Sequence, residues 1–173
     1  MAKICDNKSV GQLLYHDRHL VLIKRKNYPQ AYALPAGHLD GDEFLAGALR
    51  ETEEEVGVIV TENKLVWKGL VANPCKRDGG TYHEWEVYKA QSWKGEPKAG
   101  SDAKEFLWVL PAELKRLAER TEYFIKKYQT DDVGALTKAI FGDPAEKKTD
   151  PEWIAEMGLE PVWYFILKEL KIL

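Results

Sequence analysis

Residues 37–57 constrain the fold of this chain more than any other segment. Between Asp40 and Glu55 they include seven carboxylates, with Arg50 as the only basic residue. After residue 42 the segment is predicted to be a helix, and at 100° per residue this helix has two distinct faces. One face carries Arg50 with Glu51, Glu54 and Glu55, and the opposite face, expected to be buried, carries Leu45, Leu49, Thr52 and Val56. The helix must therefore cover a core that other elements complete.

Runs rich in β-forming residues lie on both sides of this helix. The first two are separated by the polar residues 16–19, which predicts a hairpin. Pro111 opens a second helix that ends near Tyr128. The strands are predicted at residues 10–15, 20–23, 31–34, 64–72, 82–92 and 106–110, and residues 36–42 are predicted to be a loop. This order predicts the α/β (α+β) class, with a mixed central sheet packed between helices as an α/β/α sandwich.

The chain of 173 residues has the length of one domain. We expect that domain to span residues 1–130 and a helical C-terminal extension, residues 131–173, to pack on it. Within the extension, Asp150 and Pro151 are predicted as the cap and the first residue of a helix, and Gly158 as a stop signal.

Composition narrows the class of partner. Hydrophobic residues make up 45% of the chain and charged residues 31%, which is typical of globular proteins. A net charge of -3, with Lys and Arg scattered, argues against general nucleic-acid binding. The charged N-terminus lacks the apolar core of a signal peptide, and the longest apolar run, residues 162–167, is too short to span a bilayer. We therefore expect a cytoplasmic protein without a membrane partner, and the sequence also allows a homodimer.

The two cysteines, Cys5 and Cys75, stand seventy residues apart without the C-x-x-C spacing of a zinc or redox site. We predict that both are free, buried thiols.

Acids three and four positions apart on a helix repel one another, so the face formed by Glu51, Glu54 and Glu55 calls for a counter-charge. Mg²⁺ prefers oxygen ligands and commonly joins carboxylates to phosphates, which points to pyrophosphate chemistry. Gly47 lies on the same face at a cost of about 1 kcal/mol, which indicates that a loop, ligand or metal approaches closely there. The alternative is a solvated acidic face.

Residues 50–58, Arg-Glu-Thr-Glu-Glu-Glu-Val-Gly-Val, resemble the second half of the Nudix hydrolase signature, G-x5-E-x7-R-E-U-x-E-E-x-G-U, with Thr52 at an aliphatic position. Residues 32–38, Tyr-Ala-Leu-Pro-Ala-Gly-His, are similar to the entry of that motif. The resemblance covers about residues 8–130 and implies the Nudix-type α/β/α sandwich. The first half of the motif is one residue short. Asp42 is the upstream acid if the loop is shortened, and Glu43 is that acid if the helix is. Shortening an exposed loop costs little free energy, which favours Asp42 as the upstream acid. The alternative role for Asp42 is to cap the N-terminus of the helix.

The resemblance implies a set of site residues. Glu51, Glu54 and Glu55, with the main-chain oxygen of Gly37, resemble the ligands of Mg²⁺ or Mn²⁺. Arg50 resembles the arginine that orients the glutamates, and Glu54 is our choice for the base that activates water. Asp42 completes the expected catalytic set, and Asp102 or Glu105 could add a further carboxylate.

The resemblance also implies a Mg²⁺-dependent pyrophosphohydrolase that cleaves a nucleoside diphosphate linked to another group. We expect a nucleoside triphosphate or related nucleotide as the small-molecule substrate. Pro74, sixteen positions beyond Val58, resembles a proline of ADP-ribose hydrolases, whereas residues 41–52 resemble dinucleoside polyphosphate hydrolases. A catalytically silent, nucleotide-sensing module is the remaining alternative.

Two residues are expected to bind the substrate. Arg25 is our choice for the phosphate contact, in competition with Lys24 and Lys26, and Tyr32 for stacking on the base. Tyr28, Tyr82 and Trp85 are alternatives for stacking, and packing in the core or at its rim is the alternative role for each aromatic side chain.

Overall fold

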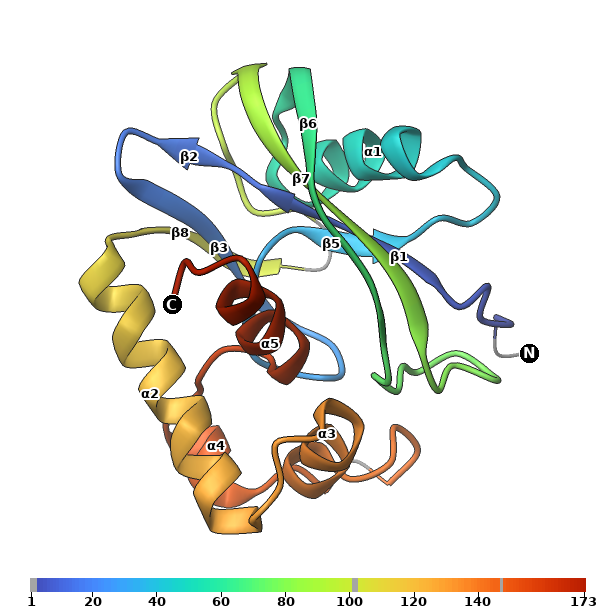
Figure 1. The fold of residues 1–173 in the computed structure, drawn as a ribbon, viewed down its shortest axis with the longest axis vertical. Helices are drawn as coiled ribbons and strands as arrows, with labels where there is room; N and C mark the ends of the chain where they lie inside the picture. The colour runs from blue at the N-terminus through green and yellow to red at the C-terminus, as the bar shows by residue number, and fades with distance from the viewer. Residues whose placement is uncertain (1–2, 101–102, 147) are drawn as a thin grey trace.

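The computed structural model describes residues 3–100, 103–146 and 148–173. Figure 1 shows the strands and helices packed together, with the helices of the C-terminal part on one side. The strands are β1 (Lys8–Leu13), β2 (Tyr15–His16), β3 (His19–Arg25), β4 (Tyr32–Ala33), β5 (Ala36–His38), β6 (Ile59–Val71), β7 (His83–Lys94) and β8 (Ala103–Val109). The helices are α1 (Phe44–Val56), α2 (Pro111–Tyr128), α3 (Val133–Phe141), α4 (Pro151–Ala155) and α5 (Pro161–Glu169).

The strands form two mixed or antiparallel sheets. The first has the order β5-β1-β7-β6, in which β1 runs parallel to β7 and the other pairs are antiparallel. In the second, β3 pairs antiparallel with β8 and also, through its two ends, with β2 and β4. The predicted hairpin around residues 16–19 is the β2–β3 pair, with His16 opposite His19. The mixed sheet and the helices around it confirm the predicted fold class.

The first sheet is covered on both faces. Val10 and Gly11 are neighbours on β1, so the side chain of Val10 and a Cβ built on Gly11 face opposite sides. On one side, Val10 packs with Leu39, Ala48 and Tyr88 beneath α1. On the other side, a Cβ built on Gly11 would come within 2.2 Å of Trp163 in α5. The sheet therefore lies between α1 and α5, which is the sandwich that the sequence predicted.

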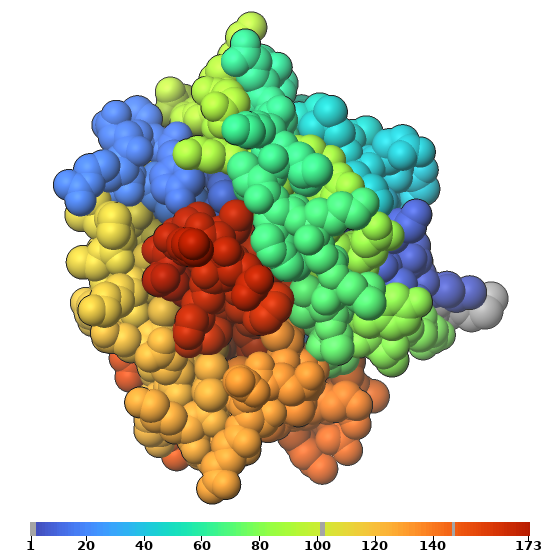
Figure 2. Space-filling view, viewed as in Figure 1, coloured from blue at the N-terminus to red at the C-terminus, as the bar shows by residue number. Residues whose placement is uncertain are grey.

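Helix α5 belongs to the main core. Trp163 is fully buried in it and meets Trp85 of β7 edge to face, with ring centroids 5.5 Å apart. Figure 2 shows the C-terminal segment in red, lodged between α2 in yellow and β6 in green. A smaller core joins α2, α3 and α4 through Phe124, Phe141 and Trp153. The extension thus contributes side chains to both cores.

The start of α1 differs from the prediction. Glu43 is the N-cap residue and the helix begins at Phe44, so Asp42 does not cap it. The buried residues of α1 are Gly47, Ala48, Thr52 and Val56, whereas Leu45 is 46% exposed. The buried stripe is rotated because the side chain of Leu39 packs against Gly47, where an added Cβ would lie 2.7 Å from Leu39 Cδ2.

Four other local predictions, for residues 36–42, Pro111–Tyr128, Asp150 and Gly158, have different outcomes. Residues 36–42, predicted as a loop, begin with β5, which pairs with β1. Helix α2 spans Pro111–Tyr128 as predicted, and Asp150 caps α4 by accepting a hydrogen bond from the Glu152 N–H at 2.8 Å. Helix α4 ends at Ala155, before Gly158. Among the residues that the structure describes, no helix has the length and apolar character needed to cross a membrane.

Candidate active site

A cavity of about 250 Å³ lies where β5, the C-terminal half of α1 and the loop after β6 meet. It brings together most of the residues that the sequence selected: Arg25, Gly37, Arg50, Glu51, Glu54 and Glu55. Tyr28, Pro74 and Trp85 also line it. Asp42 and Tyr32 are not among its lining residues.

Arg50 connects the acids of this site. Its Nη1 donates to Glu51 Oε1 at 2.7 Å and to Glu54 Oε2 at 3.3 Å, and its Nε donates to Asp42 Oδ2 at 2.7 Å. Its Nη2 donates to the main-chain oxygens of His38 at 2.9 Å and Leu39 at 3.2 Å. A planar guanidinium can hold several acceptors in fixed directions, so Arg50 sets the relative positions of the glutamates and of the segment after β5.

The Asp-Gly-Asp sequence before α1 forms a tight turn. Asp42 N donates to Leu39 O at 3.0 Å, and Asp40 and Gly41 between them have φ of 55° and 98°. Asp and Gly tolerate such angles better than other residues, which explains their presence here. The turn delivers Asp42 to Arg50, so Asp42 acts on the site through the guanidinium and does not itself line the cavity. Its chemical role stays a prediction.

The three glutamates have different surroundings. The side chain of Glu51 is only 14% exposed and that of Glu54 is 56% exposed. Burial raises the pKa of Glu51, and Arg50 opposes that rise. Glu55 Oε2 accepts a hydrogen bond from the Ala36 N–H at 2.8 Å. Glu54 is thus the glutamate most accessible from the cavity, as a group that takes a proton from water must be.

Gly37 makes room for Glu51. A Cβ built on it would lie 2.0 Å from Glu51 Cδ and 2.2 and 2.3 Å from the two carboxylate oxygens. The main chain of Gly37, however, faces β1. Gln12 N donates to Pro35 O at 2.9 Å and Val10 is paired with Gly37, so the C=O of Pro35 and both the N–H and the C=O of Gly37 point toward β1.

Ala36 alternates with Gly37 along β5, so its main-chain groups point toward α1. Its N–H donates to Glu55 there. The C=O of a strand residue points to the same side as its N–H, so the carbonyl of Ala36 faces the glutamates. The register therefore favours Ala36 over Gly37 as the source of a main-chain ligand, a residue that the sequence analysis did not select.

The donor set fits magnesium or manganese. The carboxylates of Glu51, Glu54 and Glu55 and the main-chain carbonyl of Ala36 are all hard oxygen donors at this cavity. Mg²⁺ suits such a set because it retains several waters and is held by one or two carboxylates together with phosphate oxygens.

The two residues expected to bind substrate have separate locations. Arg25 reaches the cavity, where its Nη1 donates to Glu160 Oε2 at 3.0 Å and its Nη2 to Tyr28 O at 3.3 Å. Tyr32 lines another cavity, of about 660 Å³, between β4, β8, α2 and α4. The Lys24 ammonium lies over the Tyr32 ring and also pairs with Glu105 at 3.5 Å, so these three residues belong to that second cavity or its rim. Asp102 lies outside the described residues.

Sequence reasoning missed two charged residues of the site. Glu160, at the N-cap of α5, is only 6% exposed and holds Arg25. Arg77 lines the cavity and forms a bidentate pair with Asp40, with the Arg77 Nη2 to Asp40 Oδ2 distance at 3.1 Å. Hydrogen bonding to Arg77 holds the pKa of Asp40 well below its usual range. Both pairs join segments far apart in sequence, so no local pattern could have revealed them.

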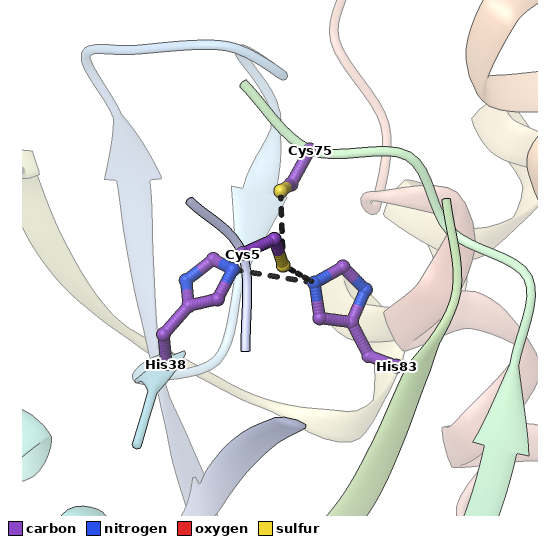
Figure 3. Close-up of side chains that lie close together, drawn as sticks. All are labelled: Cys5, His38, Cys75 and His83. Atoms are coloured by element: carbon purple, nitrogen blue, oxygen red, sulfur yellow. Dashed lines mark hydrogen bonds between the residues drawn. The ribbon is translucent and has the colours of Figure 1, made fainter. Parts of the chain in front are cut away.

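A second group of polar side chains lies beside the glutamates. Cys5, His38, Cys75 and His83 converge on one point, as Figure 3 shows, and their ligand atoms all lie within 4.8 Å of one another. Both cysteines are free thiols, as predicted, but Cys75 is only partly buried. Burial lowers the pKa of His38 to about 4 and also lowers that of His83, and it raises the pKa of the Cys5 thiol. The sequence did not predict this cluster, because each of the four residues comes from a different segment of the chain.

Comparison with known sequences identifies a family. The model of the NUDIX domain matches residues 7–128. An ADP-ribose pyrophosphatase from Methanocaldococcus jannaschii is 34% identical to this chain over 123 residues, which are 69% of this chain and 71% of that protein.

Solved structures show the same fold. A MutT NUDIX hydrolase from Burkholderia pseudomallei superposes with a TM-score of 0.54 at 24% identity, over 61% of this chain and 84% of that one. The NUDIX domain of Shewanella oneidensis NrtR, in complex with ADP ribose, superposes with a TM-score of 0.51 at 21% identity, over 67% of this chain and 78% of that one. These similarities confirm the sandwich predicted for the chain.

Proposed function

Since this chain belongs to the NUDIX family, we propose that it is a Mg²⁺- or Mn²⁺-dependent pyrophosphohydrolase of a nucleoside diphosphate linked to a sugar, with ADP-ribose as the leading candidate. The observation that carries the proposal is the arrangement of Glu51, Glu54 and Glu55 around Arg50 at one cavity. A solvated acidic face would need neither a cavity nor an orienting arginine. It would also not need a glycine at position 37 to leave room for the Glu51 carboxylate.

The choice of ADP-ribose is supported by the relative and by the cavity. The Methanocaldococcus protein named an ADP-ribose pyrophosphatase is 34% identical over two thirds of this chain. Pro74, whose position resembles that of a proline in ADP-ribose hydrolases, lines the cavity, and so does Tyr28. A nucleoside triphosphate, expected from the sequence, is the alternative that the assay must exclude.

The mechanism assigns a task to each residue of the site. The metal ion, when bound, neutralises phosphate charge and lowers the pKa of a coordinated water. Glu54 takes the proton of the attacking water, because it is the most exposed of the three glutamates. Arg50 holds Glu51 and Glu54 in position, and Arg25, fixed by Glu160, binds a phosphate oxygen of the substrate.

The test is a turnover screen with matched variants. The purified chain is assayed with Mg²⁺ against ADP-ribose, nucleotide sugars, dinucleoside polyphosphates and nucleoside triphosphates, and the products are identified by mass. We expect AMP and ribose 5-phosphate from ADP-ribose. Glu54→Gln should lower kcat by about 10²–10⁴-fold, which is the usual contribution of a general base.

The matched control is Glu53→Gln, because Glu53 is the exposed neighbour of Glu54 on α1. It removes the same charge from the same helix and should keep kcat. Preference for triphosphates over ADP-ribose would replace the substrate assignment. Absence of turnover on every compound would favour a silent nucleotide-sensing module, and normal turnover by Glu54→Gln at saturating metal would exclude Glu54 as the base.

A further inference from the structure

The geometry points to a structural zinc site, separate from the glutamates, formed by Cys5, His38, Cys75 and His83. The four side chains come from the N-terminal segment, β5, the loop after β6 and the start of β7. The chain has two cysteines and four histidines, so both cysteines and half of the histidines meet at one point. Neither the proposed hydrolysis nor its magnesium ligands requires this convergence.

Two of the distances between the ligand atoms match the edges of a zinc tetrahedron, and a third is shorter. With Zn–S of about 2.3 Å and Zn–N of about 2.0–2.1 Å, a regular tetrahedron has edges of about 3.8 Å for S–S, about 3.3 Å for N–N and about 3.6 Å for S–N. The observed distances are 3.7 Å between Cys5 Sγ and Cys75 Sγ, and 3.2 Å between His38 Nε2 and His83 Nε2. Cys5 Sγ to His83 Nε2 is 3.2 Å, about 0.4 Å shorter than the tetrahedral S–N edge. A small outward movement of Cys5 Sγ would therefore let the four side chains hold one ion.

The contacts behind the ligands are those expected of a metal centre. His83 Nδ1 lies 3.0 Å from Asn73 O, so a proton on Nδ1 donates to that carbonyl and leaves the Nε2 lone pair facing the cluster. Asn7 N donates to Cys5 Sγ at 3.3 Å, and Arg77 N donates to Cys75 Sγ at 3.4 Å. Main-chain N–H groups aimed at sulfur stabilise thiolates, which are the form of cysteine that binds a metal.

Zinc is the metal that suits this donor set. Two sulfurs and two imidazole nitrogens in a tetrahedron are typical of structural zinc, and four protein ligands leave no open position for a reacting water. His38, Cys75 and His83 also line the cavity of the active site, which gives the ion a route of entry. Magnesium prefers oxygen ligands, so the two sites are selective for different metals.

Such a site would fasten the parts of the chain that surround the cavity. His38 follows Gly37 on β5, and its main-chain oxygen accepts a hydrogen bond from Arg50. Cys75 lies in the loop that also supplies Pro74 and Arg77 to the cavity. Zinc would therefore hold β5 and this loop together, next to the catalytic glutamates.

The test measures metal content and coordination in the full chain, purified without a histidine tag after growth with zinc. We expect about one zinc per chain that survives gel filtration, with X-ray absorption showing two sulfurs at about 2.3 Å and two nitrogens at about 2.0–2.1 Å. Cys75→Ala should lose this zinc, whereas His16→Gln, which removes an exposed histidine outside the cluster, should keep it. Zinc below about a tenth of an equivalent after reconstitution, or a shell of nitrogen and oxygen alone, would overturn the proposal.

A second measurement does not depend on any variant folding correctly. Cobalt(II) added to the metal-depleted wild-type chain should give the strong visible bands of a tetrahedral thiolate complex, and zinc should abolish them. Intact mass under non-reducing conditions reports the competing state, a bond between Cys5 and Cys75, as a loss of two hydrogens. Absence of the cobalt bands, or a disulfide in protein prepared under reducing conditions, would contradict the zinc site.

Discussion

Replacing Gly37 with alanine should displace Glu51 with little change elsewhere. The new Cβ would lie 2.0 Å from Glu51 Cδ, whereas carbon atoms in contact are about 3.5 Å apart. The carboxylate must therefore move by about 1.5 Å, and it is the end of a flexible side chain that can do so. The main-chain groups of residues 36 and 37 stay in place, so the perturbation is confined to the position of one carboxylate.

The effect on catalysis follows from that displacement. A misplacement of about 1 Å in an active site costs about 10²-fold in rate, so kcat/KM for ADP-ribose should fall by about 10²-fold, or about 2.7 kcal/mol of transition-state stabilisation. The concentration of Mg²⁺ needed for half-maximal activity should rise as well. The assay is steady-state hydrolysis across a magnesium titration, with thermal unfolding measured on the same samples.

The control is Gly41→Ala, in the turn between β5 and α1. Gly41 has a φ of 98° and a Cβ built on it meets no atom within 4 Å, so alanine strains the backbone by about 1–2 kcal/mol without contacting Glu51. Gly41→Ala should lower stability and keep activity. Wild-type kcat/KM in Gly37→Ala at low magnesium would refute the role of Glu51, and an equal loss in both variants would assign the effect to the turn.

Two further predictions concern stability. Burial raises the pKa of Asp150, but hydrogen bonds from Lys127 and Tyr128 outweigh that rise and lower the pKa to about 2. The ionised carboxylate therefore stabilises the fold fully above pH 4, and this stabilisation is lost as the pH falls through 2. Asp150→Asn should lower the free energy of unfolding by about 1–3 kcal/mol at pH 7 and by less at pH 3 in urea titrations, and a difference independent of pH would contradict this. Trp163→Ala should cost about 3–5 kcal/mol in the same assay, and Trp163→Phe less, because the buried indole N–H has no hydrogen-bond partner among the described residues.

What the sequence could predict depended on local patterns. All strands except β5, the second helix and the acidic face of α1 follow from residues close in sequence, and so does the cap at Asp150. The buried stripe of α1 was wrong at Leu45 because the packing of Leu39 against Gly47, a contact outside the helix, sets its rotation. Periodicity predicts that a helix is amphipathic, but the partner decides which residues are covered.

The same limit applies to the site. Arg25 and Tyr32 have comparable sequence support, yet only Arg25 reaches the cavity, because Tyr32 lies on β4 and lines the cavity beside α2. The side chain of Glu160, at the N-cap of α5, and the cluster around Cys5 both depend on contacts between segments tens of residues apart. No periodicity or short motif encodes such contacts, so they become visible only in the fold.

Strand β5 shows why the acids of α1 have structural as well as chemical tasks. It is three residues long, and within the part of the chain that the structure describes it pairs on one side only, with β1. Its outer edge would leave the Ala36 N–H and the His38 carbonyl without a strand partner, and unsatisfied main-chain groups are costly. Glu55 accepts a hydrogen bond from the Ala36 N–H, and Arg50 donates one to the His38 carbonyl. Two side chains of α1 thus replace a neighbouring strand. The carbonyl of Ala36 lies between these two contacts on the same edge, and the helix therefore holds in place the main-chain oxygen that we propose as a metal ligand beside its glutamates.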